Sequence, residues 1–190
     1  MKYDNALALR VSLETGARIS DVLALREENL QGRTLRYVAA KTGKPDRKVI
    51  TADLAGKLRR NAANGFFFPG RYGDKPKTRQ AIWHDLKRAA VMAGVSPAGL
   101  SPHFARKDYA VEVFRDKGFA AAQEALQHDR ADTTMLYCFA DVLTSDTATG
   151  RGVTGQKYVF TEEELYFLAE VIANKVVDKL KKCTEIQEFL

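Results

Sequence analysis

The sequence predicts a mixed fold that is mainly α-helical, with one small antiparallel β-sheet and a separate C-terminal helix. Three observations support this prediction. Apolar residues recur at helical spacing before residue 30 and again beyond Thr78. Between them, residues 34–51 alternate apolar and polar side chains on both sides of a turn that contains Gly43 and Pro45. A stretch rich in Thr, Ser, Gly and Asp, residues 144–155, then separates the last helix from the body.

Two helices are expected at the start of the chain. Residues 6–15 are apolar on nearly all sides, which is typical of a buried helix. Gly16 follows them and is a natural left-handed terminator. A short second helix is expected over residues 20–26, with Ser20 as its N-cap.

The sheet is expected to consist of a hairpin and a short third strand. Residues 34–40 form the first strand of the hairpin, residues 41–46 the turn, and residues 48–51 the returning strand. Residues 66–68, three phenylalanines that end at a proline, are expected to form the third strand.

Beyond Thr78 the pattern is helical. One helix is marked by Ile82 and Leu86 and ends near Gly94, and Pro102 occupies a first-turn position of another that runs to about residue 114. Shorter helices follow to about residue 139. A capping box at residues 161–164 begins the final helix. Its apolar residues form one stripe: Leu165, Leu168, Ile172, Val176 and Leu180.

Composition and charge narrow the class of function. No apolar run approaches the 18 or so residues that span a bilayer, and no secretory leader is visible, so a cytoplasmic protein without membrane partners is expected. Cys138 and Cys183 make neither a disulfide framework nor a metal motif. The net charge is +6, and because residues 161–190 carry −3, the other 160 residues carry +9. A basic body of this kind favours a polyanionic partner.

Four residues in the first half of the chain could bear on chemistry. Arg18 stands at the entrance of the second helix, and Asp21 follows three residues later. The hairpin turn carries Lys41 and Lys44. Taken alone, these are as well explained by a structural ion pair and an ordinary turn. A phosphate-binding loop is not a suitable explanation, because Pro45 replaces the Ser or Thr that such a loop needs after its lysine.

The second half adds four more candidates. His103 and Arg106 lie at i and i+3, so they project from the same side of the expected helix. His128 stands nine residues before Tyr137. A His-x-x-Arg pair is usually a solvated helix face and an isolated tyrosine is usually part of a core, so the order and spacing of the whole set matter more than any member.

Together these residues resemble the catalytic domain of the tyrosine recombinases, the phage-integrase family, over about residues 5–142. The most specific parts are a Thr-Gly-x-Arg-x-x-Asp opening and a Thr-Thr-x-x-Tyr ending. Gln127 replaces a usual glycine and Ala105 a usual leucine, but neither change removes a catalytic group. The family's catalytic order is filled by Arg18, Lys41, His103, Arg106, His128 and Tyr137.

The resemblance implies a role for each of these side chains. Arg18 and Arg106 would clamp a DNA phosphate, and His128 would add a donor. Tyr137 would attack the phosphorus with help from His103, which gives a 3′-phosphotyrosine without metal or cofactor. Lys41 would protonate the leaving 5′-oxygen. Lys44 is a rival for that role, but Lys41 matches the family's distance from the first arginine better.

The resemblance also implies domains and partners. Residues 1–142 would be the catalytic domain, residues 143–160 a flexible connection and residues 161–190 the tail helix, with the family's N-terminal DNA-binding domains absent. Double-stranded DNA is the expected partner, bound by a homo-oligomer that is expected to be a tetramer. The oligomer is expected to assemble through the tail, with docking of the tail on its own domain as the alternative, and accessory DNA-bending proteins are possible further partners. The candidate phosphate contacts are Lys44, Arg47 and Lys48 on the hairpin, and Arg71, Lys75, Lys77 and Arg79 beyond it.

Two alternatives remain open at this point. Type IB topoisomerases use a similar set of side chains, so DNA relaxation is a second possible activity. A DNA-binding regulator without catalysis could also use the same fold, although the complete set of six residues argues against it. Asp21 is expected to be structural, supporting Arg18 or the start of its helix.

Overall fold

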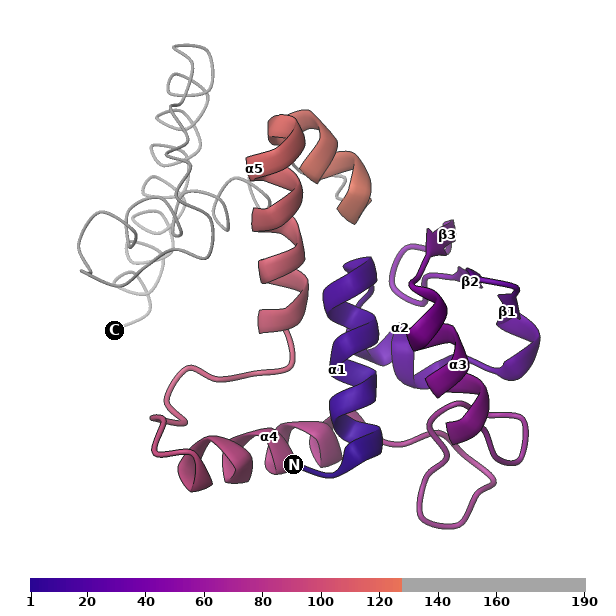
Figure 1. Cartoon of the computed structure of the whole chain (residues 1–190), viewed down its shortest axis with the longest axis vertical. Coiled ribbons are helices and arrows are strands. Elements are labelled where there is room, and N and C mark those ends of the chain that lie inside the picture. The colour runs from indigo at the N-terminus through magenta and orange to yellow at the C-terminus, as the bar shows by residue number, and fades with distance from the viewer. Residues whose placement is uncertain (128–190) are drawn as a thin grey trace, which may run out of the picture. The chain divides into compact units, whose positions relative to one another are not determined.

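The computed structural model describes residues 1–127, which are mainly helical with one three-stranded antiparallel sheet, as the sequence predicts (Figure 1). The predicted helices near residue 139 and in the tail lie outside the described residues. The chain divides into two compact units, residues 1–112 and 113–190. The elements in chain order are α1 (Tyr3–Thr15), α2 (Ile19–Ala24), the 3₁₀ helix η1 (Glu27–Asn29), β1 (Leu30–Gln31), β2 (Thr34–Val38), β3 (Pro45–Val49), α3 (Ala52–Asn61), α4 (Arg79–Met92) and α5 (Phe104–Leu126).

Helices α1 and α2 meet at a sharp, well-bonded corner. Gly16 ends α1 in the left-handed conformation, with φ 68°, and its N–H donates to the Ser12 carbonyl at 2.8 Å. The buried hydroxyls of Ser12 and Thr15 donate to backbone carbonyls at 2.7 and 2.6 Å, so the corner is held on both sides. Arg18, rather than the predicted Ser20, occupies the N-cap of α2, and it makes no side-chain capping bond.

The sheet has the order β1-β2-β3. Its third strand is β1, which pairs with β2 at Gln31↔Thr34, and not the predicted segment at residues 66–68. That segment makes only isolated bridges, from Phe66 to Arg26 and to Ala63, and its three phenylalanines are all buried. The returning strand begins at Pro45, three residues earlier than predicted, because the turn is closed by a bond from the Ala39 N–H to the Lys44 carbonyl at 2.9 Å.

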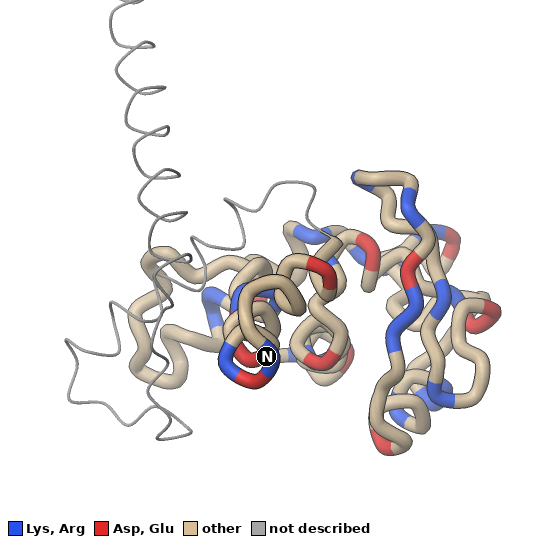
Figure 2. Tube along the Cα trace, turned by 90° about the horizontal axis from the view of Figure 1, so that it is seen from above, with Lys and Arg blue, Asp and Glu red and all other residues tan. Residues whose placement is uncertain are grey.

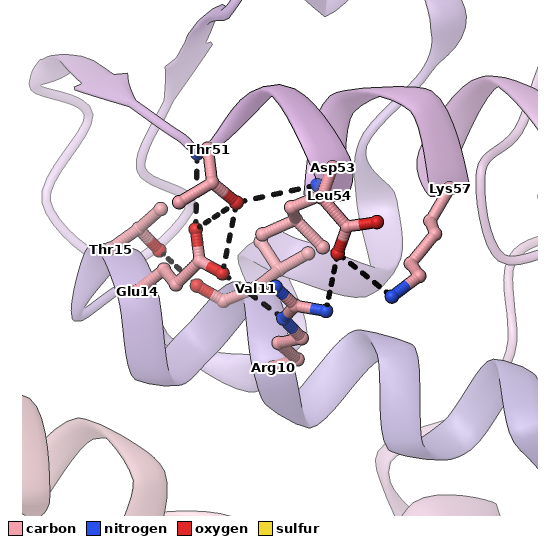
Figure 3. A network of polar contacts seen from close by, with 8 residues as sticks. All are labelled: Arg10, Val11, Glu14, Thr15, Thr51, Asp53, Leu54 and Lys57. Carbon is pink, nitrogen blue, oxygen red and sulfur yellow. Dashed lines mark hydrogen bonds and ion pairs between the residues drawn. The ribbon is translucent and has the colours of Figure 1, made fainter.

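Helix α3 was not among the predicted elements, and polar contacts tie it to α1 (Figure 3). Thr51 is its N-cap, and its backbone N–H donates to the Glu14 carboxylate at 3.1 Å. One turn earlier on α1, Arg10 donates to Asp53 at 2.8 Å, and Lys57 donates to the same carboxylate oxygen at 2.8 Å. These bonds connect the end of the sheet to the last two turns of α1.

The core of residues 1–112 lies among α1, α2 and α3, which Figure 1 shows beside the sheet. Ile82 and Leu86 of α4 and Ala105 of α5 join this core. Helix α5 is interrupted at Gly118, whose φ of 81° is not helical. Beyond residue 112, a separate small cluster is built around Phe114. No helix within residues 1–127 is long and apolar enough to cross a membrane.

Candidate active site

Three of the predicted catalytic residues come together where α2 begins and α5 begins. Arg18 caps α2, while the His103 carbonyl accepts the first backbone bond of α5, from the Lys107 N–H at 3.1 Å. Partial burial lowers the pKa of the His103 imidazole below its usual 6.5, and four neighbouring cations lower it further: Arg106, Arg79, Lys107 and Arg18. The imidazole therefore stands in a cluster of positive charge, which favours its neutral form.

Arg106 is the most constrained of these side chains. It is only 6% exposed, and its Nη1 donates a hydrogen bond to the carbonyl oxygen of Gly16 at the α1–α2 corner. One turn further along α5, the ring of Tyr109 lies so close to Gly16 that a Cβ there would overlap it. Arg106 and Tyr109 of α5 thus both contact Gly16 at the α1–α2 corner. This corner leads directly into Arg18, so the contacts hold the two predicted phosphate-binding arginines close to each other.

The predicted lysine lies on the hairpin turn. Lys41 is exposed within the loop of residues 40–43, where Gly43 takes a φ of 66°. The buried Asp21 of α2 accepts a hydrogen bond from the backbone N–H of Ala40 at 3.1 Å. Asp21 is therefore structural, as expected, but its partner is the hairpin backbone next to Lys41 and not Arg18. This bond places the turn beside the helix that Arg18 caps.

The remaining two members of the predicted set, His128 and Tyr137, lie outside the described residues. Their assignment stays a prediction from the sequence pattern. Within residues 1–127, no group of three His, Cys, Asp or Glu side chains could hold a metal ion.

On the hairpin, the predicted DNA-contact residues fall on different faces. Figure 2 shows Lys and Arg along the hairpin strands. Arg47 is exposed, and the sheet register places it opposite the exposed Arg36, which was not among the predicted contacts. Two like charges directly across a strand pair repel each other, and an anion that binds both relieves the repulsion. Lys44 is exposed beside the turn, whereas Lys48 points to the inner face with 13% of its side chain accessible.

Beyond the hairpin, three of the four predicted basic residues are exposed and one is half-buried. Arg71 and Lys75 are exposed on a loop that is held by a Gly70 N–H bond to the Lys75 carbonyl at 2.7 Å. Lys77 instead forms an ion pair with Asp4 and is half-buried. Burial lowers the pKa of Lys77, and its assignment as a DNA contact stays a prediction. Arg79, by contrast, is exposed at the start of α4, and its charge is close enough to His103 to lower the pKa of that imidazole.

A pocket of about 260 Å³ adjoins His103. Its walls come from the starts of α2, α4 and α5, and they include Arg79 and the indole of Trp83. Arg79 and His103 both line this pocket. The sequence pattern did not reveal the pocket, because the three segments that form it are far apart in the chain.

Comparisons with known proteins identify the family of the chain. Residues 1–142 match the model of the phage integrase family. The chain belongs to that family. It is 30% identical over 136 residues to the integrase of Escherichia phage P2, a match that covers 70% of this chain and 37% of the phage protein. It is also 30% identical over 155 residues to the tyrosine recombinase XerD of Mycobacterium tuberculosis strain H37Rv, covering 73% of this chain and 48% of XerD.

Solved structures of the same family share the fold. A λ integrase (75–356) dimer bound to a COC′ core site superposes with a TM-score of 0.62 at 16% identity, covering 83% of this chain and 56% of that one. The XerH recombinase in a post-cleavage complex with palindromic difH gives 0.61 at 19% identity, covering 77% and 46%. The catalytic domain of the bacteriophage HP1 integrase gives 0.53 at 21% identity, covering 79% and 84%. The matched part of this tyrosine recombinase chain covers less than half the length of each of these two relatives.

Proposed function

We propose that the chain is the catalytic domain of a site-specific DNA recombinase that cuts and rejoins DNA through a 3′-phosphotyrosine. The observation that carries the proposal is the gathering of Arg18, His103 and Arg106 around one corner, with Arg106 buried and bonded to the Gly16 carbonyl. These three come from segments almost ninety residues apart, in the order of the family's motif. Solvated surface residues would have no reason to converge in this way.

The electrostatics of this cluster suit an anionic phosphate. Like charges held close together are costly unless an anion neutralises them, and guanidinium groups offer paired donors to phosphate oxygens. Arg18 and Arg106 supply two such groups, and His128 a further donor. Negative charge that develops on the nonbridging oxygens during attack is stabilised by the same donors, which is the largest expected contribution to the rate.

The reaction balances with side chains of this chain alone. The Tyr137 phenol gives its proton to the neutral imidazole of His103 as its oxygen attacks phosphorus. The bond from phosphorus to the 5′-oxygen breaks, and that oxygen takes a proton from the Lys41 ammonium. The products are a 3′-phosphotyrosine and a free 5′-hydroxyl, and the reverse sequence rejoins a strand. The depressed pKa of His103 favours the neutral imidazole, which is the form that can accept a proton.

The biological task that we propose is integration or excision of a mobile element, such as a phage genome. The match to the phage P2 integrase supports this choice. Two of the superposed structures are complexes with DNA, one of them of an integrase dimer, which supports duplex DNA and further copies of this chain as partners. We propose a tetramer that assembles through the tail helix of residues 161–190, with accessory DNA-bending proteins as additional partners.

The test is covalent trapping on nicked DNA. A randomised pool of nicked duplexes is incubated with the whole chain, and DNA that is attached to protein is isolated and sequenced. Tyr137→Phe should abolish the adduct and leave DNA binding unchanged, because only the attacking oxygen is lost. Tyr3→Phe, which alters an exposed tyrosine at the start of α1, is the matched control and should behave as wild type. An adduct that persists in Tyr137→Phe, or none with wild type, contradicts the proposal.

A further inference from the structure

The inner face of the β2–β3 hairpin carries a polar cluster that the reaction does not use. Tyr37 and Asp46 are cross-strand partners, and the Tyr37 hydroxyl donates to Asp46 Oδ2 at 2.8 Å. The other carboxylate oxygen, Oδ1, lies 3.6 Å from the ammonium of Lys48. The side chains of Asp46 and Lys48 are each only 13% accessible, so this ion pair lies beneath the hairpin and not on the solvent side.

The same cluster reaches helix α5. The ammonium of Lys48 stands over the ring of Tyr109, 5.9 Å from its centroid. That ring is the one that packs on Gly16, one turn from Arg106. The hairpin therefore contacts α5 through Lys48, next to the residues of α5 that contact Gly16 at the α1–α2 corner.

The charges of the cluster depend on Asp46. Burial lowers the pKa of Lys48, Asp46 opposes that shift, and the positive charge of Arg106 adds to it. Burial raises the pKa of Tyr109, and the negative charge of Asp46 raises it further. Asp46 thus supplies the negative charge that lets two cations, Lys48 and Arg106, stay close to each other in a partly desolvated place.

In the pairing of β2 with β3, Asp46 is also close to the turn that carries Lys41. The pair Val38↔Pro45 follows Tyr37↔Asp46, and the Ala39–Lys44 bond then closes the turn. A hairpin held at its inner face by Asp46 and at its turn by Asp21 has little freedom to lift away from α2 and α5. The bond from the Ala40 N–H to Asp21 holds the turn at a second place.

We propose that Asp46 is a positioning residue, which latches the hairpin onto α5 through Lys48 and so sets where Lys41 presents its proton. The proposal rests on the proposed function, because it assigns Asp46 a task in the step that Lys41 performs. Asp46 touches no reacting atom. Its effect passes through the Lys48–Tyr109 contact, so Lys48 serves the latch and is not a phosphate contact.

The test uses a substrate that does not need Lys41. When sulfur replaces the bridging 5′-oxygen, the leaving thiolate departs without a proton. Single-turnover cleavage of both substrates is measured with the 190-residue chain on the duplex that the adduct assay selects. Because general acid catalysis contributes about 10²–10⁴-fold, Asp46→Asn should slow cleavage of the oxygen substrate about tenfold or more. The same variant should cleave the sulfur substrate at close to the wild-type rate, as Lys41→Ala should.

A second variant and a control keep the test decisive. Tyr37→Phe removes only the hydroxyl that donates to Asp46, and it should give a smaller defect with the same dependence on the leaving atom. Asp53→Asn removes a carboxylate that also pairs with a lysine, on α3, and it should leave both rates unchanged. Equal slowing of the two substrates by Asp46→Asn would overturn the latch, as would no slowing of either. If wild type cleaves neither substrate, the proposed function itself fails.

Discussion

The guanidinium of Arg106 donates to the carbonyl of Gly16, a residue ninety positions earlier in the chain. The same glycine has a φ of 68°, and a Cβ added to it would overlap the ring of Tyr109. A buried arginine needs its donors satisfied, and here a backbone carbonyl accepts from one of them, while the charge of Arg106 lowers the pKa of His103. The corner of α1 and α2 is therefore as much a part of the site as the charged residues.

Gly16→Ala should consequently lower both stability and cleavage. A left-handed φ costs a residue with a Cβ roughly 1–2 kcal/mol, and overlap with the Tyr109 ring adds about 1–3 kcal/mol. Gly32→Ala is the matched control, because Gly32 has a φ of 61° but nothing within 4 Å of its added Cβ. Urea unfolding of the two variants measures the difference. Equal losses of unfolding free energy would show that the ring does not restrict position 16.

The lowered pKa of His103 gives a pH prediction with a definite sign. Because this pKa is lowered, the imidazole takes up a proton at a lower pH than an unperturbed histidine, so kcat/KM for cleavage should fall only as pH drops through the depressed pKa. Folding stability follows the same direction, since the unfolded chain binds this proton first and stability declines below pH 6.5. A His103→Ala variant should lose the acidic limb of the rate profile. An acidic limb centred above 6.5 in wild type would contradict the assignment.

Arg36 and Arg47 should contribute to DNA affinity through their charge alone. For duplex DNA, the slope of log affinity against log salt is about −0.9 per phosphate contact, so reversing either residue to Glu should make the slope shallower by about that amount. Each reversal also replaces a repulsive cross-strand pair by an attractive one, so the loss of affinity should not be accompanied by loss of stability. Arg60→Glu, the same change on α3, is the control. An unchanged slope in Arg47→Glu would make this face an ordinary solvated surface.

The tail should matter for assembly and not for the fold of the body. Its stripe of five large apolar residues has the sequence of a helix that docks, and burying each one is worth about 1.5–3 kcal/mol. A chain that ends at Thr154 should remain folded and bind DNA, but lose cooperativity on duplexes that carry two sites. Sedimentation with and without DNA measures this. If the shortened chain unfolds, or assembles as well as the full one, the helix belongs to its own body and docking on a neighbour is wrong.

Much of the site could be predicted from sequence because the family motif is local in each of its parts. Gly16 and Arg18 belong to one short segment, so the left-handed end of α1 could be predicted from turn chemistry, although the N-cap of α2 was placed two residues too late, at Ser20. The burial of Arg106 could not, since it depends on the Gly16 carbonyl being within reach of a helix ninety residues away. Distant contacts of this kind leave no periodic trace in the sequence.

The inner position of Lys48 was missed for a related reason. Strand alternation shows which residues share a face, but the face depends on register, and register depends on where the turn closes. The turn closes at Lys44, so Pro45 begins the returning strand and residues 46 and 48 point inward.

Helix α3 had signals that were overlooked. Its sequence has the signature of a helix: an N-cap at Thr51, an acidic residue, Asp53, in the first turn, and two arginines in the last turn. The run of phenylalanines at residues 66–68 shows the opposite case. It has the composition of a strand, but its backbone turns back on itself, because the amides of Ala63 and Phe66 each donate to the other's carbonyl.

The bond from the Thr51 N–H to Glu14 also bears on how the protein folds. These residues are 37 positions apart, and the whole sheet lies in the chain between them, so the contact closes a loop around β1, β2 and β3. Closing a long loop costs entropy before its contacts form, so the hairpin and the docking of α3 on α1 should become structured together as one cooperative unit. The amides of Ala39 and Ile50, both bonded within the hairpin region, should then exchange with deuterium at rates close to that of Thr51. Glu14→Ala should accelerate all three to the same extent, whereas acceleration of Thr51 alone would mean that the hairpin orders independently.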